Sequence, residues 1–337
     1  MRLSIWFAGA LVAGTLGVGT ARADEQQERA VIAAEVMRMM DANDYAGLES
    51  LANSYREKAL RTESGVWKLS QFYYGISKKF NMRDQGDLIW APRVQWAEAW
   101  LKQSPSSPTA QVVAAQLQMN LAWAYRGTSG YAYKVEKERW APFKDQVRVT
   151  GEYLTRVRKT ARKDPHWYVL SLQVAKNGNV DDATFMALFE EGIKRHPEYL
   201  PIYFEGVGNA LPKWGGNPQK IDTLVRQSLR RVKARDRATL YTRMYWVASQ
   251  NQYGNALFTR TLADWAVMKR GFDDMLKVYP SEWNLQAYTY FACAASDYAK
   301  ARTLMLQMKQ PADPEQWEER DFYDSCRRQA FALETSA

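Results

Sequence analysis

The stretch LAWAYRGTSGYAYKV contains the residue types that could bind an anion. Arg126 would supply a guanidinium, and Ser129 a hydroxyl group. Tyr131 and Tyr133 would add phenolic hydroxyls and ring faces beside them. These four residues are therefore candidate ligand-binding residues.

The same stretch also has the pattern of a helix end. Gly127 follows Arg126 at the end of an apolar helical pattern, and a glycine there closes a helix at little steric cost. Anion sites usually use helix N-termini, whereas this loop follows a C-terminus. A Walker loop is absent as well, because no Gly-Lys-Ser/Thr follows at the required distance. The residues favour a structural loop and leave ligand binding as the alternative.

A second loop, NALPKWGGNPQKID over residues 209–222, contains the fifth candidate, Trp214. Its indole could stack on a sugar or a partner, or it could fill the junction between two helical pairs. Packing is the favoured interpretation. Asn217 and Pro218 are placed to open the next helix, with the proline in its first turn.

Motifs for catalysis and metal binding are missing from the sequence. The two histidines, His166 and His196, form no H-E-x-x-H motif, and no G-x-S-x-G elbow occurs. Adjacent carboxylates such as Glu190 and Glu191 point in different directions on a helix, so they do not form a catalytic pair by themselves. We therefore expect no metal and no cofactor, and no enzymatic reaction is indicated.

Two cysteines, Cys293 and Cys326, lie near the C-terminal end. A disulfide between them would tie the last helices together in an oxidising compartment. Two separate buried thiols are the alternative, and the spacing does not decide between them.

Helical periodicity extends over nearly the whole chain. Val113, Leu117 and Leu121 mark one buried helix face, and Phe185 and Phe189 mark another. Alternation typical of a strand is scarce. The sequence therefore predicts an all-α protein.

A recurring proline punctuates this helical pattern. Four segments share one spacing. In each, two apolar or small residues lie three positions apart, and a proline follows the second of them five positions later. The prolines are Pro105, Pro165, Pro197 and Pro280. This spacing is typical of the second helix of a tetratricopeptide repeat. In the last unit, Asp297 is placed to cap the second helix of a hairpin. We expect an irregular tetratricopeptide-like α-solenoid, because such hairpins bury their apolar faces on one another.

Several blocks also resemble a known family. They include GVWKLSQFYYGI, WAEAWLKQSPSSPTAQ, DPHWYVL, YLPIYFEGVGNALPKWGG and YPSEWNLQAYTYFACAASDYAKAR. In this order they are similar to the bacterial domain of unknown function 4034 family, over about residues 65–302. The resemblance implies a helical, repeat-like protein. It supplies no reaction and no catalytic residue.

The N-terminus has the pattern of a secretory signal peptide. Arg2 precedes an apolar stretch that ends at an Ala-x-Ala site, so we expect cleavage after Ala23 and an exported, periplasmic protein. The remaining chain, residues 24–337, is expected to be a single elongated helical-repeat domain without a transmembrane helix. Loss of Arg2 and Arg22 would lower the formal net charge from +9 to +7.

These observations lead to two hypotheses of function. The first is a non-enzymatic scaffold for an envelope protein or peptide, because stacked hairpins present long binding surfaces. The second is a glycan- or small-molecule-binding protein, or an enzyme, that uses the Arg126–Tyr133 and Trp214 loops. An acidic glycan or lipid surface would suit the positive charge. An exported protein rarely meets nucleic acid, so we expect no such partner.

Overall fold

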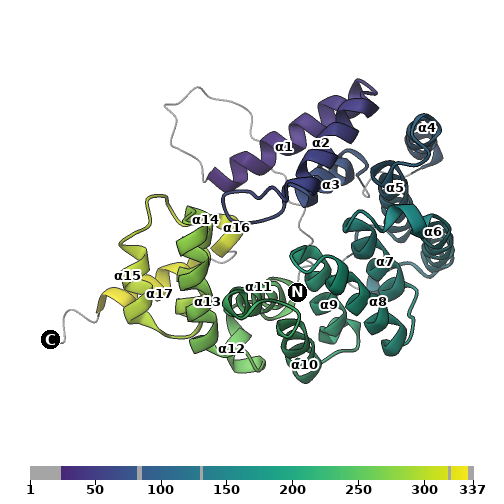
Figure 1. Ribbon diagram of the computed structural model, residues 1–337. Helices are drawn as coiled ribbons and strands as arrows, with labels where there is room; N and C mark the ends of the chain where they lie inside the picture. The colour runs from purple at the N-terminus through teal and green to yellow at the C-terminus, as the bar shows by residue number, and fades with distance from the viewer. Residues whose placement is uncertain (1–23, 82–85, 130–131, 318–319, 333–337) are drawn as a thin grey trace. The chain divides into compact units, whose positions relative to one another are not determined.

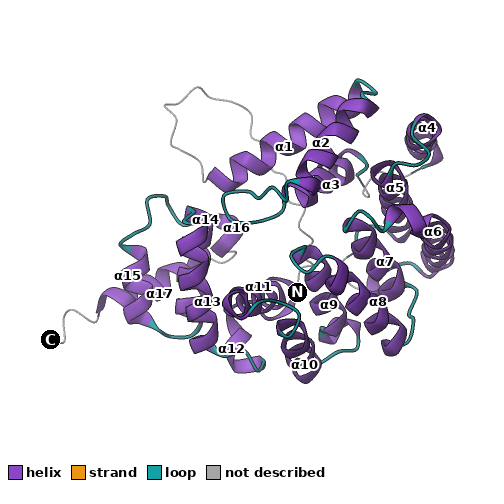
Figure 2. Ribbon diagram, in the orientation of Figure 1, coloured by secondary structure: helices purple, strands orange, loops and turns teal. Residues whose placement is uncertain are grey.

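The computed structural model describes residues 24–81, 86–129, 132–317 and 320–332. Helices make up most of these residues, and within them no β-strand forms (Figures 1 and 2). An isolated antiparallel bridge joins Arg61 and Trp67. The predicted all-α, helical-repeat fold is confirmed.

The chain groups into two compact units. The first contains residues 30–61 and 67–206, and the second contains residues 24–29, 62–66 and 207–332 among those described. Two helices, α1 (Asp24–Asp41) and α9 (Leu200–Ala210), contribute residues to both units. The expectation of a single domain over 24–337 remains a prediction, and the expected leader lies outside the described residues.

The remaining helices of the first unit follow one another with short connections. They are α2 (Tyr45–Glu57), α3 (Lys68–Lys79), α4 (Asp87–Gln103), α5 (Pro108–Arg126), the 3-10 turns η1 (Ala132–Lys134) and η2 (Lys137–Arg139), α6 (Trp140–Ala161), α7 (His166–Asn177) and α8 (Asp182–Arg195). Helix α5 packs along α6 and against α4, and α7 packs against both α6 and α8. Most of α5 is buried, so it forms the centre of this unit's core.

The second unit contains the other helices. They are η3 (Pro212–Trp214), α10 (Pro218–Leu229), η4 (Ala234–Asp236), α11 (Arg237–Ala248), the π-helix η5 (Ser249–Tyr253), η6 (Gly254–Ala256), α12 (Leu257–Arg260), α13 (Trp265–Val278), α14 (Glu282–Ala294), α15 (Tyr298–Met305), α16 (Pro314–Trp317) and α17 (Arg320–Ala332). Helix α13 packs against α11 and α14, and α15 packs against α14 and α17. Stacked Phe272 and Tyr288 rings, 4.8 Å apart, join α13 to α14.

Helix ends occur where the sequence predicts them. Pro105, Pro165, Pro197 and Pro280 each lie within four residues of the end of α4, α6, α8 and α13, respectively. A proline disfavours the interior of a helix, because it lacks the N–H group and its ring clashes with the preceding turn. The predicted helix ends are therefore confirmed.

The predicted caps are present as well. The Asp297 carboxylate accepts a hydrogen bond from the Lys300 N–H at 3.1 Å and opens α15. Asn217 caps α10 in the same way, with Pro218 in the first turn. Gly127 ends α5 with a φ of 86°, which favours glycine because a Cβ atom would be strained there.

A short strap, residues 62–66, is built into the second unit. The Ser64 carbonyl accepts hydrogen bonds from Arg243 at 2.6 Å and from Asn284 at 3.2 Å. The buried Glu25 carboxylate accepts from the Thr62 hydroxyl at 3.0 Å and from the Ser64 N–H at 2.9 Å. The start of α1 and the strap therefore complete the polar interior of a unit whose other residues come much later in the chain.

A disulfide joins Cys293 on α14 to Cys326 on α17, with a Cα–Cα distance of 5.6 Å. Both residues are buried. Of the two alternatives that the sequence leaves open, the structure contains the bonded pair. The bond fixes α17 to the preceding hairpin.

Within the described part of the chain, no helix combines the length and the apolar character needed to cross a membrane.

Removal of the disulfide is expected to destabilise the second unit. The bond closes a loop with a sequence separation of 33 residues, and loop-closure entropy predicts a loss of about 3–4 kcal/mol in Cys293→Ser/Cys326→Ser. Urea unfolding with and without a reductant measures this loss. Reductant should lower the stability of the wild type and leave the double variant unchanged. Equal stability of both proteins would contradict the expectation.

Candidate functional site

Arg126 packs into the end of α5, and its exposed fraction is 9%. Its guanidinium donates to the Ser129 carbonyl at 2.8 Å and lies 5.2 and 5.4 Å from the ring centres of Trp123 and Trp140. Burial lowers the pKa of Arg126, since it disfavours the charged form. These contacts are those of a residue that closes the loop onto the helix. They support the structural interpretation of the sequence motif.

Of the other predicted ligand residues, Ser129 contacts Arg126 through its backbone carbonyl. Tyr133 is 78% exposed, and Tyr131 lies outside the described residues. Trp214 belongs to the second unit, in the turn before α10, and is 39% exposed. A ligand-binding role for these residues remains a prediction.

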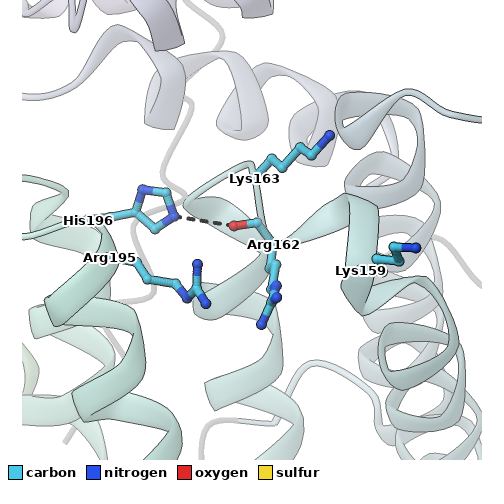
Figure 3. Close-up of a pocket in the computed structure, with 5 residues that line it drawn as sticks. All are labelled: Lys159, Arg162, Lys163, Arg195 and His196. Carbon is cyan, nitrogen blue, oxygen red and sulfur yellow. Dashed lines mark hydrogen bonds between the residues drawn. The ribbon is translucent and has the colours of Figure 1, made fainter.

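A basic pocket of about 440 Å³ lies in the first unit instead (Figure 3). It is lined by Lys159, Arg162, Lys163, Arg195 and His196, and these five residues are called the basic pocket below. Two successive hairpins build it: the first three residues come from the end of α6 and the turn after it, and the last two from the end of α8. A cation-rich hollow of this kind is suited to an anionic ligand.

Helix geometry explains why these cations lie together. Lys159, Arg162 and Lys163 are three and four residues apart at the end of a helix, so they share one face. Arg195 and His196 occupy the corresponding end of α8. Figure 3 shows the guanidinium groups of Arg162 and Arg195 reaching toward one another, with the lysines pointing elsewhere. The flexible lysine stems allow their ammonium groups to swing toward a bound anion.

The local charge balance remains positive. The pocket lining has four cationic side chains and no carboxylate of its own. One carboxylate lies beside it, Glu191, whose Oε1 lies 3.4 Å from Arg162 Nη1 and 3.2 Å from Arg195 Nε, and which also pairs with Arg158 outside the lining. The two helix C-termini contribute about half a negative charge each, which leaves about two positive charges uncompensated. Among the described residues, the ammonium groups of Lys159 and Lys163 have no ion-pair or hydrogen-bond partner. The helix dipoles therefore account for only part of this cation cluster.

His196 contributes a neutral ring near pH 7. Burial lowers its pKa, although a hydrogen bond to the Arg162 carbonyl opposes the shift. Its Nε2 lies 3.3 Å from that carbonyl, which only accepts, so Nε2 carries the proton. The bond ties the end of α8 to the end of α6. The histidine thus holds the two sides of the pocket together.

A buried network of hydrogen bonds holds the turn that carries Arg162 and Lys163. Asp164, the residue after Lys163, is fully buried and accepts from Arg56 Nη2 and Tyr73 Oη, both at 2.5 Å. Its other oxygen accepts from the His166 N–H at 2.8 Å. One carboxylate therefore connects α2, α3 and the start of α7 to the turn that presents Arg162 and Lys163.

His166 extends this network as a neutral ring. It stacks on Tyr73 with a centroid distance of 4.1 Å, and its Nδ1 and Nε2 lie 3.0 Å from Tyr199 Oη and 3.3 Å from Gln116 Oε1. The amide oxygen only accepts, so Nε2 donates to it, and Nδ1 accepts from the tyrosine. Burial lowers the pKa of His166 to about 4, with Asp164 opposing the shift. The residue is a neutral link in the core.

A second hollow, of about 470 Å³, lies along α17 and is lined by Asp324, Arg327, Arg328 and Phe331. Its lining has two arginines and one carboxylate, so its formal excess of positive charge is smaller. No group of three or more His, Cys, Asp or Glu side chains is placed to hold a metal ion among the residues that the structure describes.

The sequence contains a signal for the basic pocket that residue-by-residue motif searches miss. The run RVRKTARK ends a predicted helix before Pro165, and KRH ends another before Pro197. Each run alone resembles a solvated helix end. Only the packing of successive hairpins brings the two runs together, because they are more than thirty residues apart in the chain.

Compared with known proteins, the chain matches no family model, no curated protein and no solved structure. The resemblance to the domain of unknown function 4034 family therefore stays a prediction. The structure itself defines the class, an all-α protein of helical hairpins with a basic pocket in its first unit.

Replacement of Asp164 should destabilise the first unit strongly. Asp164→Asn leaves the Arg56 guanidinium, with a side-chain exposure of 15%, without its counterion, and such losses cost about 3–5 kcal/mol. Tyr73→Phe removes one hydrogen bond to the same carboxylate and should cost only about 1 kcal/mol. Chemical unfolding of both variants measures the difference. Equal losses would show that the ion pair is not the dominant contact.

The low pKa of His166 predicts acid sensitivity. The unfolded histidine binds a proton below about pH 6.5, and the folded one only below about pH 4. The unfolded state thus binds more protons in this window, and stability should fall by about 3 kcal/mol between pH 6.5 and 4. In His166→Gln, which keeps a donor and an acceptor, urea unfolding over this window should show a slope smaller by about one proton. An unchanged slope would contradict the assignment.

Proposed function

We propose that this protein is a non-enzymatic binding scaffold of the cell envelope, which recognises an acidic segment of a partner protein through the basic pocket. The observation that carries the proposal is the excess of about two positive charges where the ends of α6 and α8 meet. Stacked helical hairpins are suited to binding extended peptides, because successive turns present side chains along one surface.

The chemistry of the lining favours binding over a reaction. Arginine guanidinium groups and lysine ammonium groups bind carboxylates through charge-assisted hydrogen bonds and need no proton transfer. The supporting Asp164 is already bonded to Arg56, Tyr73 and the His166 N–H, so its part is to hold the turn in place. Arg162 and Lys163 are thereby presented on a rigid base, which lowers the entropy lost on binding.

The alternative hypothesis, a glycan or small-molecule site formed by the Arg126–Tyr133 and Trp214 loops, has less support. The Arg126 guanidinium already donates to the Ser129 carbonyl and contacts two indole rings. Tyr133 and Trp214 both have exposed rings, but they belong to different units. Export to the periplasm belongs to this proposal, since it rests on the leader pattern in the sequence.

The affinity of the basic pocket for an acidic peptide should depend on Lys159 and Lys163. A fluorescent ten-residue polyglutamate peptide is titrated with purified protein, and anisotropy is read at two salt concentrations. We expect Lys159→Ala/Lys163→Ala to weaken binding about tenfold at the lower salt, because each lost charge near the site removes up to about 1 kcal/mol.

A matched variant separates site binding from general attraction. Lys102→Ala/Lys144→Ala removes the same charge from exposed positions on α4 and α6 of the same unit. Its affinity should change less than twofold. If both double variants lose the same affinity, the attraction comes from overall charge and the proposed site is wrong.

A further inference from the structure

We infer that Glu191 is a built-in competitor for the ligand of the basic pocket, and that it makes the pocket selective for segments with several adjacent negative charges. This inference rests on the proposed function, because it concerns the same pocket. It assigns a specificity-determining role to a residue that is not one of the five lining residues.

Glu191 collects donors from three helices and a turn. Its Oε1 accepts from Tyr168 Oη on α7 at 2.8 Å, from Arg195 Nε on α8 at 3.2 Å and from Arg162 Nη1 at 3.4 Å. Its Oε2 forms an ion pair with Arg158 on α6. The side chain is 25% exposed, so the carboxylate is partly shielded from water.

The carboxylate is anionic at neutral pH. Partial burial alone would raise the pKa of Glu191, but the Tyr168 hydroxyl and the neighbouring arginines lower it below its ordinary value. Burial and the hydrogen bond to Glu191 raise the pKa of Tyr168, so its hydroxyl remains a donor. Three guanidinium groups and one hydroxyl thus surround a carboxylate that is negatively charged at neutral pH.

Two of these arginines, Arg162 and Arg195, also line the basic pocket. A ligand carboxylate that binds them must share them with Glu191 and meets its repulsion. A single carboxylate therefore gains little, because it largely replaces an interaction that the protein already makes. A guanidinium has five N–H donors, so additional contacts are available to a ligand that supplies further charge.

The two lysines of the pocket can bind a second negative charge of the ligand. Lys159 and Lys163 have no side-chain partner among the described residues, so neither gives up an existing contact when an anion arrives. A segment with adjacent acidic residues can place one carboxylate near the arginines and another near a lysine. The ligand class is therefore a cluster of acidic side chains rather than an isolated one.

The test compares Glu191→Gln with wild type, using the polyglutamate peptide and a peptide of equal length with one glutamate. We expect Glu191→Gln to bind polyglutamate about three- to tenfold more tightly and to gain more for the single-glutamate peptide, so that discrimination between the peptides falls. Glu152→Gln is the matched control, because it removes an exposed carboxylate of α6 that pairs with Arg148. Its affinities should change less than twofold.

Unchanged or weaker binding by Glu191→Gln would overturn the inference, and Glu191 would then serve to position the arginines. If the substitution prevents folding, Glu191→Asp, which keeps the charge on a shorter side chain, should show the same changes to a smaller degree, and unchanged affinities would again overturn it. Failure of the proposed function looks different, because wild-type binding would then be insensitive to Lys159→Ala/Lys163→Ala.

Discussion

The first unit depends on a buried carboxylate in the turn between α6 and α7. Asp164 accepts hydrogen bonds from α2, α3 and α7, and its charge is balanced by Arg56. Burial of an ion pair is costly unless every oxygen is satisfied, and here both oxygens have partners. A helical hairpin normally contacts only its neighbours in the chain, whereas this carboxylate links helices separated by more than one hundred residues. The network therefore specifies how the hairpins are arranged.

The basic pocket is a consequence of this arrangement. The turn that carries Asp164 inward also carries Arg162 and Lys163 outward. Inside, the cation and the anion are matched; outside, the cations exceed the anions. In the same short segment, the buried charge is thus fully paired, whereas the charges at the surface are not. A binding site on a rigid support usually has this arrangement.

Local features of the fold could be predicted from the sequence. Prolines end helices for steric reasons, and Asp297, Asn217 and Gly127 act within a few residues of themselves. The pocket could not be predicted in this way, because it requires knowing that the end of α8 packs beside the end of α6. Arg126 has attractive chemistry in the sequence, but its burial between Trp123 and Trp140 depends on tertiary packing. The ligand-binding role of the Arg126 loop therefore stays a prediction, and the basic pocket is a site that the sequence motifs did not indicate.

The strap at residues 62–66 has a consequence for how the protein is made. Its partners Arg243 and Asn284 leave the ribosome some 180 to 220 residues later. Until then, the Ser64 carbonyl must accept its hydrogen bonds from water or from other partners. The second unit thus cannot complete its folding until its C-terminal helices have been synthesised. A fragment that starts at residue 207 would lack residues 24–29 and 62–66, which belong to this unit. The second unit is therefore defined by contacts among separate segments of the chain and not by one continuous range of residues.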